Sequence, residues 1–410
     1  MSEQHSVGGQ TNHANWTTRV AWMSLIAATG VGVIYVPQPI QTLVAADFAV
    51  ESAWVSAATV SVQLGYALGV LFLVALGDRY SARRQVTTQL ALTAIALALT
   101  AASPSYVLVV VLMGVAGAAA TIGQILVAAA LRLSPPEVRA RTTATIVGSI
   151  GVGLFTVRTT LGSLAEAIGW RGALLVVALL VVALIPVSLR FSPAEAPVNP
   201  PRYGAILRSL PRVAGHSATL RTMAAIHMLT FSGFIALWSM SAVHAVNVLG
   251  LSVTAAALLG LAGLAGGATT ILVASWHTRV GPSLSLIVSM GAGLVATVLV
   301  LVATNVIWAL VIAFYLISFS MTSEQVATQA TGLRSVDPAE SGRANTVFMA
   351  TAFLGSSLVT AAAAVVYQLA GYAGAGVLAF ACVLVGTLVA LAAYRRGYFT
   401  QTPAVTPPAR

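Results

Sequence analysis

The stretch "PPEVRARTTATIVGSIGVG" at residues 135–153 returns in altered form as "DPAESGRANTVFMATAFLG" at residues 337–355. The two stretches align without a gap, and at the same offset "GWRGA" (169–173) meets "GYAGA" (371–375). Matches spread over two loops and a helix indicate a duplicated unit rather than coincidence. The paired positions include Pro136 with Pro338, Arg141 with Arg343, Thr143 with Asn345 and Gly153 with Gly355.

The composition shows that lipid must be the solvent for most of this chain. Of its 410 residues 58% are hydrophobic and only 7% are charged, and the mean hydropathy is +0.92. Soluble globular proteins have about 25% charged residues. Because so few charges cannot cover a core of this size, the sequence predicts a multi-pass membrane protein.

Twelve apolar runs are long enough to cross a bilayer, since a helical crossing needs about 20 residues. The predicted fold is an all-α integral membrane protein with two six-helix bundles, residues 18–190 and 222–396. We expect a disordered tail over 1–17, a second tail over 397–410 and a cytoplasmic linker over 191–221, in which "YGAILRSL" is either a short interfacial helix or a loop. The predicted crossings are 18–46, 52–76, 85–103, 106–131, 142–165, 171–190, 222–246, 253–275, 283–303, 306–330, 344–367 and 372–394.

The basic residues predict how these helices are oriented. All 20 of them are arginines, and the net charge is +10. With the N-terminus in the cytoplasm, the outer segments hold only one arginine, Arg171, together with Asp47, Glu51 and Glu166. This positive-inside bias predicts two cytoplasmic termini in a bacterial plasma membrane. Because the arginines lie at the ends of apolar runs, we expect the lipid bilayer and no nucleic acid as partner.

Sequence motifs for catalysis and for ATP use are missing. Cys382 is the only cysteine, which excludes an internal disulfide and a thiolate metal site. The sequence has no H-E-x-x-H zinc motif and no nucleotide-binding P-loop. We therefore expect no metal, no cofactor, no enzymatic activity and no ATP-driven pump in this chain.

The repeat itself indicates a function class. Copies separated by six helices share one orientation, so they are parallel repeats related by an axis along the membrane normal. Two such bundles enclose one path, and the substrate of such transporters binds near mid-membrane between them. The prediction is a monomeric secondary transporter, with a receptor or channel as the alternative from another class.

The loop "LGDRYSARRQV" (76–86) resembles the signature of the major facilitator superfamily between helices 2 and 3, and the resemblance extends over essentially the whole chain. Asp78 and Arg79 match the signature, and Arg83 follows as a further basic residue. The resemblance implies a cytoplasmic gate formed by these three residues. In it, the aspartate holds the ends of helices 2 and 11 together, where the helix dipole favours a carboxylate. The alternative, favoured for Arg83, is that the arginines only set the topology.

Within that superfamily the chain is similar to the drug:proton antiporter-1 type of exporters. The signature loop departs from the superfamily pattern at Ser81 and Ala82, and the chain lacks the exporters' proline in the helix 5 motif and their arginine in helix 4. The resemblance implies proton-coupled efflux of a drug-like compound or metabolite. The similar stretches are "YVPQPIQTLVAADF", "VQLGYALG", "GVGLFTVRTTLG" and "GRANTVFMATAFLG".

Two charged residues lie well inside predicted helices, Arg158 and Glu324. Each costs about 2.5–3.5 kcal/mol at a helix centre, so both should face protein or water. Arg158 is predicted to hold an anionic substrate group or a carboxylate partner, and the alternative is that it snorkels to the outer headgroups. Glu324 is predicted to carry protons, and the alternative is an interfacial pair with Arg334 or Arg343.

Uncharged polar residues are predicted to line the rest of the path. The stretch "VPQPIQ" (36–41) places two glutamines beside prolines, whose missing N–H groups free backbone carbonyls along a wet cavity. His227 can titrate near neutral pH, although a lone histidine in a helix is commonly a packing residue. Asn345 is predicted to cap its helix. The remaining candidates are Gln38, Gln41, Gln63, Tyr66, Gln124, Trp238 and Tyr315.

The sequence therefore predicts a secondary transporter that exchanges protons for a small organic molecule on its way out of the cell. A proton-coupled importer of a sugar or organic acid is the second hypothesis, because the sequence does not fix the direction of transport.

Overall fold

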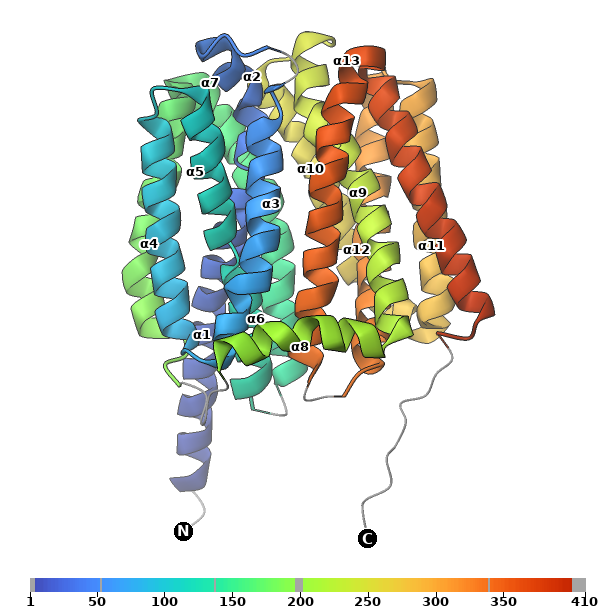
Figure 1. The fold of residues 1–410 in the computed structure, drawn as a ribbon. Coiled ribbons are helices and arrows are strands. Elements are labelled where there is room, and N and C mark those ends of the chain that lie inside the picture. Colours follow the sequence, from blue (N-terminus) through green and yellow to red (C-terminus); the bar gives the residue numbers. More distant parts are fainter. Residues whose placement is uncertain (1–3, 52–53, 136–137, 196–201, 338–339, 400–410) are drawn as a thin grey trace.

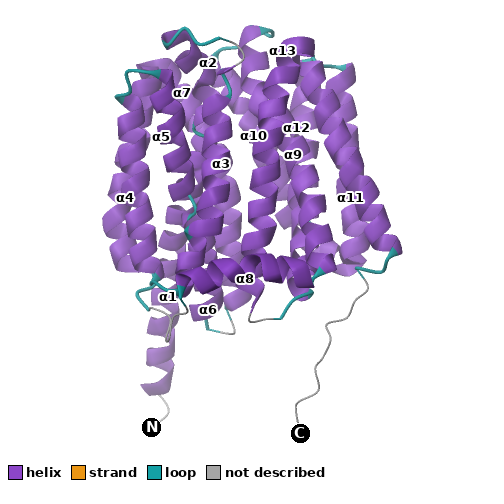
Figure 2. Cartoon of the chain, viewed as in Figure 1, coloured by secondary structure: helices purple, strands orange, loops and turns teal. Residues whose placement is uncertain are grey.

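A computed structural model describes residues 4–51, 54–135, 138–195, 202–337 and 340–399. Within these ranges the chain forms helices and turns and no strand (Figure 1, Figure 2). We call residues up to Phe191 the N-terminal half and residues from Ala218 the C-terminal half. The N-terminal half contains α1 (Gln4–Gly32), the 3-10 turn η1 (Val33–Tyr35), α2 (Pro37–Asp47), α3 (Ala57–Phe72), the 3-10 turn η3 (Val74–Asp78), α4 (Ala82–Ala101), α5 (Tyr106–Ala119), α6 (Ile122–Leu133) and α7 (Arg139–Phe191). After α8 (Tyr203–His216), the C-terminal half contains α9 (Ala218–Asn247), α10 (Val253–Leu272), α11 (Ala274–Val302), α12 (Ile307–Arg334) and α13 (Ser341–Arg395).

Nine helical segments of the described chain are long and apolar enough to cross a membrane. Two of them, Thr145–Phe191 and Ser341–Arg395, have 47 and 55 residues, far more than the about 20 residues that one crossing needs. Each is a pair of helices joined at a kink, where Gly169 has φ 78° and Gly371 has φ 61°. An L side chain rarely adopts such a φ, so the backbone explains why glycine occupies this position in both copies of the repeat.

The first predicted crossing, 18–46, is not one continuous helix. It consists of α1, η1 and α2, because Pro37 and Pro39 have no N–H to continue the helical hydrogen bonds. The backbone oxygen of Val33 accepts instead from the N–H of Val36 at 3.1 Å. The proline at the start of α2 is favourable, since the first N–H groups of a helix have no partner within it.

α1 also includes most of the predicted tail over 1–17. The helix begins at Gln4, and the stretch up to Tyr35 contains no proline that would end it. Trp16 fixes this part of α1 to α7, because its Nε1–H donates to Oγ1 of Thr142 at 3.2 Å.

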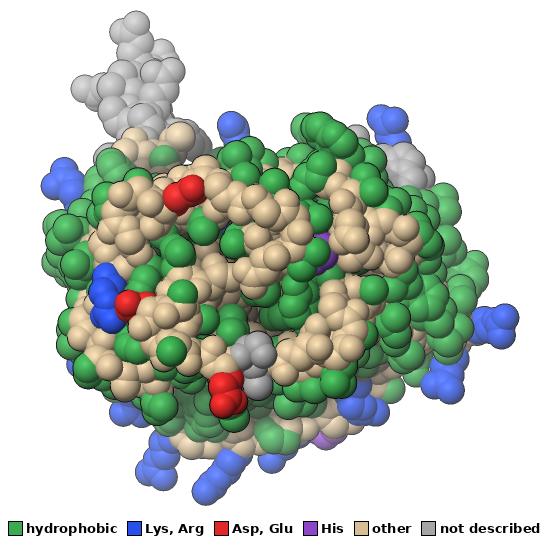
Figure 3. All heavy atoms as spheres, turned by 90° about the horizontal axis from the view of Figure 1, so that it is seen from above, with side chains coloured by type: hydrophobic (Ala, Val, Ile, Leu, Met, Phe, Trp, Pro, Cys, Tyr) green, Lys and Arg blue, Asp and Glu red, His purple; other side chains and the backbone are tan. Residues whose placement is uncertain are grey.

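The two halves meet through α3 against α13 and α7 against α10. α9 lies centrally, packs on α12 and α13 and is the most buried of the nine spans. Large apolar side chains such as Leu272 and Leu369 are about four-fifths exposed, at 80% and 81%. Figure 3 shows such side chains around the rim of the molecule. This surface fits the hydrocarbon of a bilayer, which does not penalise exposed apolar groups.

α8 settles the two alternatives for the linker in favour of a helix. It lies across one end of the molecule, nearly perpendicular to the other helices (Figure 1). Its apolar residues Ile206, Leu210 and Val213 are buried at helical spacing. The exposed residues Arg208 and Arg212 lie on the opposite side.

Close packing of α3 on α5 yields a first prediction. A Cβ added at Gly117 would overlap the backbone oxygen of Val62, which cannot move aside as a flexible side chain can. We expect Gly117→Ala to destabilise the protein by about 1–3 kcal/mol, although alanine favours helices by about 1 kcal/mol over glycine. The measurement is the melting temperature of the purified protein in detergent.

The matched control is Gly151→Ala in α7, where an added Cβ has no neighbour within 4 Å. This variant should melt at or above the temperature of the unchanged protein. Equal melting temperatures for the two variants would contradict the packing described here.

Candidate functional site

Arg158 in α7 is completely buried, at 0% exposure. Its Nη1 donates to Oε1 of Gln38 at 2.8 Å and to the backbone oxygen of Trp238 at 3.3 Å. Its Nη2 donates to Oγ of Ser241 at 2.7 Å. Gln38 belongs to the N-terminal half and the other two acceptors to α9, so the guanidinium bridges the halves. The side chain therefore does not reach the headgroups as the snorkelling alternative requires.

Aromatic rings surround this guanidinium. Its Cζ lies 4.1 Å from the centroid of the Trp238 ring, which is within cation–π range. Tyr35 approaches the same indole from the N-terminal half, with centroids 6.2 Å apart. Further rings pack on Trp238 at 5.2–5.3 Å, from Phe155, Phe234 and Phe314.

Contacts between the halves close the region on either side of Arg158. Nε2 of Gln41 in α2 donates to the backbone oxygen of Ser239 in α9 at 2.8 Å. Oγ1 of Thr159 in α7 donates to the backbone oxygen of Ala257 in α10 at 3.2 Å. In this conformation the centre is filled by side chains, and a bound molecule would have to replace some of these contacts.

Glu324 is paired with His227 and not with Arg334 or Arg343. Nδ1 of His227 in α9 lies 3.0 Å from Oε2 of Glu324 in α12, and both residues are buried. Oγ1 of Thr328 donates to the other carboxylate oxygen at 2.7 Å. The histidine is thus not a lone packing residue, because it shares a hydrogen bond with an ionisable group inside the protein.

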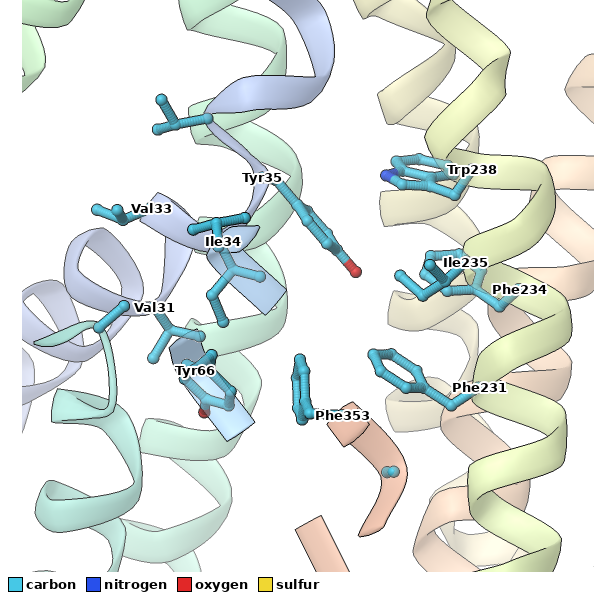
Figure 4. Packing of buried hydrophobic residues seen from close by; sticks show 14 of the residues in the cluster. Val31, Val33, Ile34, Tyr35, Tyr66, Phe231, Phe234, Ile235, Trp238 and Phe353 are labelled. Atoms are coloured by element: carbon cyan, nitrogen blue, oxygen red, sulfur yellow. The ribbon is translucent and has the colours of Figure 1, made fainter. Parts of the chain in front are cut away.

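An aromatic ladder on α9 joins the His–Glu pair to the arginine. His227, Phe231, Phe234 and Trp238 follow one another at helical spacing, with successive ring centroids 5.7, 6.2 and 5.2 Å apart. Figure 4 shows three of these rings along α9, with rings of the N-terminal half opposite them. Phe353 of α13 connects the two sides, at 4.9 Å from Phe231 and 4.4 Å from the Tyr66 ring.

A chain of amides crosses between the halves closer to the α8 end. Nε2 of Gln124 donates to the hydroxyl of Tyr66 at 3.3 Å, and Oε1 of Gln124 accepts from Nδ2 of Asn345 at 3.5 Å. Gln329 donates to Oδ1 of Asn345 at 2.6 Å. Asn345 is therefore not a helix cap as predicted: α13 begins at Ser341, and the amide joins this chain instead.

Two further candidates lie in contacts of different kinds. Gln63 joins the halves, because its Oε1 accepts from Oγ1 of Thr360 at 2.9 Å. The hydroxyl of Tyr315 pairs with Oγ1 of Thr269 at 3.0 Å, which links α12 to α10 within the C-terminal half.

Several residues of this site were not predicted from the sequence. Ser241, Thr328 and Thr360 carry short hydroxyl side chains, which in apolar helices commonly bond back to their own helix and give no signal. Tyr35 had a signal, because it lies two residues before the proline that breaks the first crossing.

Comparison with known proteins gives the family. The sequence profile of the Major Facilitator Superfamily matches residues 20–360. The chain belongs to this superfamily. A probable transporter of Streptomyces coelicolor, SCO4007, is 26% identical over 366 residues, which cover 89% of this chain and 85% of that protein. The uncharacterized transporter YgaY of Escherichia coli is 30% identical over 228 residues, 56% of this chain and 58% of its own length.

Two solved transporter structures have the same fold as this chain. A bacterial homolog of the human lysosomal transporter Spinster, inward-facing and unoccupied, has a TM-score of 0.68 at 16% identity and covers 95% of this chain and 99% of that one. The nucleoside transporter NupG has a TM-score of 0.71 at 12% identity and covers 92% and 99%. At these identities the likeness concerns the fold alone. The fold and the superfamily membership thus rest on separate comparisons that agree.

The superfamily signature loop is described only in part. The side chain of Asp78 lies outside the described residues, so its contact with helix 11 stays a prediction. Arg79 is exposed and stacks on Tyr80 at 5.9 Å. Arg83 binds the segment that directly follows α7, with Nε donating to the backbone oxygen of Ser192 at 3.2 Å.

The buried pair leads to a second prediction. His227→Phe keeps a ring that can stack on Phe348, now 4.8 Å from the histidine, but removes the partner of Glu324. Removing one member of a buried pair costs about 3–5 kcal/mol where the group left behind is charged. We expect a fall of this order in stability, measured by thermal melting in detergent.

The double variant His227→Phe/Glu324→Gln should recover part of this loss, since it leaves no unpaired charge. His216→Phe, the same substitution at an exposed position of α8, is the control and should leave the melting temperature unchanged. A double variant that melts no higher than His227→Phe would show that the two residues are not coupled.

Proposed function

We propose that this protein is a proton-coupled exporter of small organic molecules that works by alternating access. The observation that carries the proposal is the coexistence of two buried ionisable sites: the hydrogen-bonded pair His227–Glu324 within the C-terminal half, and Arg158 at the boundary of the two halves. Intramembrane ionisable residues are costly and mark substrate and proton pathways. The resemblance to drug:proton antiporter-1 exporters supports the direction and the subtype.

The proposed topology has twelve crossings. Dividing the two longest spans at Gly169 and Gly371 adds two crossings to the nine spans, and α4, with 20 residues, supplies the last. Both described ends of the chain, at α1 and α13, lie at the α8 end of the molecule (Figure 1). On the opposite face, acidic side chains lie at a few separate places among apolar and uncharged atoms, and the basic side chains in view lie mostly at the rim (Figure 3). The positive-inside rule supports a cytoplasmic α8 end in a bacterial plasma membrane.

This topology gives a third prediction. In a Cys382→Ala background, single cysteines at Arg208 in α8 and at Glu51, both exposed, should react from opposite sides in intact cells. A membrane-impermeant maleimide should label the Glu51→Cys variant and spare Arg208→Cys until the membrane is opened. Labelling of both, or the reverse pattern, would contradict the proposed orientation.

The proton step is assigned to the His–Glu pair. The imidazole and the carboxylate hold at least one proton between them, and Thr328 donates to the remaining carboxylate oxygen. When the halves open on one side, water reaches the pair and a proton can be gained or lost. Because the ladder of rings ends on Trp238 beside Arg158, a change at the pair is linked mechanically to the substrate side.

The gate is assigned to Asp78, Arg79 and Arg83, which lie at the α8 end, where the superfamily signature implies closure against helix 11. One chain holds both halves of the path, so we propose a monomer. The substrate path is proposed to be lined by Gln38, Gln41, Gln63, Tyr66 and Gln124. Trp238 lies on this path beside Arg158, and Tyr315 lines the side of the path formed by α12.

A proton-coupled importer of a sugar or organic acid is the second candidate. The likeness to NupG, a nucleoside transporter, adds nucleosides to the substrates to be tested. Uptake into inverted membrane vesicles under an imposed pH gradient, screened over antibiotics, nucleosides, sugars and organic acids, separates the two directions. Acceleration of uptake by an acidic vesicle lumen supports export, whereas acceleration by an alkaline lumen supports import.

The fourth prediction concerns coupling. Glu324→Gln cannot release a proton from its amide but keeps the shape of the carboxyl group. We expect the variant to exchange labelled substrate across the membrane at equilibrium, while the pH gradient no longer accelerates its net transport. The readouts are counterflow and gradient-driven uptake in the same vesicles.

Gln325→Glu is the control variant. It changes the neighbouring position on α12 and adds a carboxyl group there, while Glu324 stays unchanged. It should keep its response to the gradient. Gradient-driven transport by Glu324→Gln at the native rate would remove this residue from the coupling role.

A further inference from the structure

The centre of the molecule holds donors without acceptors. Buried side-chain nitrogens with no hydrogen-bond partner include Nε of Arg158, Nε2 of Gln38 and Nε1 of Trp238. All three lie in one cluster, because Gln38 and Trp238 both contact the guanidinium of Arg158. Buried donors without partners are rare, and each leaves a desolvation cost of about 1–3 kcal/mol uncompensated. The cluster is therefore complementary to a ligand that brings acceptors.

The charge of the cluster is also uncompensated. The acceptors of Arg158 are an amide, a hydroxyl and a backbone carbonyl, all neutral. Among the described residues no carboxylate pairs with it, and the intramembrane Glu324 is held by His227 and Thr328. A lone positive charge in a medium of low dielectric attracts an anion strongly.

We infer that the substrate held at Arg158 is an organic monocarboxylate with an apolar, aromatic body. This inference deepens the proposed function and rests on it. The guanidinium edge formed by Nε and Nη2 matches the two oxygens of a carboxylate, because such pairs are commonly bidentate. The Ser241 hydroxyl, which now accepts from Nη2, is the neutral group that the carboxylate replaces.

The aromatic residues around Arg158 determine which substrate body fits beside the carboxylate. Trp238, Tyr35 and Phe155 present ring faces and edges, which suit an aromatic body through stacking. A sugar would need many paired donors and acceptors, which these rings do not supply. A cationic drug would be repelled, because Arg158 already occupies the face of the indole.

The position of the cation couples binding to opening. Arg158 is carried by α7 of the N-terminal half, whereas Ser241 and the Trp238 carbonyl are carried by α9. When the halves separate there, the guanidinium loses these two acceptors and has free donors. A carboxylate that enters can take them up, and its release restores the contacts seen in the closed structure.

The charge carried by the substrate has a consequence for energetics. One-for-one exchange of an outgoing monoanion for an incoming proton moves two positive charges into the cell per cycle. Export would then be driven by the membrane potential as well as by the pH gradient. Exchange of a neutral molecule moves one charge, and exchange of a monovalent cation moves none.

A fifth prediction tests the substrate class through binding. The probes are benzoate, 2-naphthoate and indole-3-acetate, with their primary amides and the matching primary amines as neutral and cationic counterparts. We expect carboxylates to raise the melting temperature of the purified protein and amides and amines not to. Arg158→Gln should lose the response, and Arg158→Lys, which keeps the charge, should retain part of it.

Arg84→Gln, at an exposed arginine near the α8 end, is the matched control and should respond to carboxylates as the native protein does. The carboxylate-to-amide comparison uses the native protein, so it stands even if a variant fails to fold. A response to amides or amines instead of carboxylates, no response to any carboxylate, or an undiminished response in Arg158→Gln would each overturn the inference.

Transport separates this inference from the proposed function. In proteoliposomes, carboxylate uptake in the export direction should be accelerated by a lumen-positive potential as well as by an acidic lumen. If amides or amines are carried under the pH gradient and carboxylates are not, the proposed function stands and the anion inference fails. If the gradient drives none of the three classes nor any compound of the wider screen, the proposed function itself fails.

Discussion

A positive charge in the hydrocarbon region must find its hydrogen bonds inside the protein, and this constraint organises the centre of the molecule. The guanidinium of Arg158 takes its acceptors from both halves, so the resting contact between α7, α2 and α9 depends on it. Neutral acceptors hold such a charge less firmly than a carboxylate does. The proposed exchange of these acceptors for a substrate carboxylate is consistent with this difference.

The second buried charge site obeys the same constraint in a different way. Glu324 is surrounded by His227, Thr328 and the rings that stack on the histidine, all of them in the C-terminal half. One site thus lies across the boundary of the halves, and the other lies within one half. α9 joins them, because His227 and Trp238 are on the same helix, with Phe231 and Phe234 between them.

The sequence predicted the membrane class, the repeat and the identity of both buried charges, because lipid leaves few alternatives for a charge in an apolar run. It did not predict their partners. His227 lies 97 positions from Glu324, and Ser241 lies 83 from Arg158, so only tertiary packing brings them together. The broken first crossing follows from Pro37 and Pro39, whereas Asn345 was misassigned to a helix cap because its amide partners come from other helices.

α8 touches both halves at one end of the molecule. The hydroxyl of Tyr203 near its start donates to the backbone oxygen of Phe72 in α3 at 2.9 Å, and its later turns pack on α9 and α13. Rocking that widens this end must stretch α8, slide it or break the Phe72 bond, whereas no helix in the described part of the chain lies across the far end in this way. In the proposed alternating access, the two ends of the molecule would therefore differ in stiffness, and the length of a single helix would limit how far the α8 end can open.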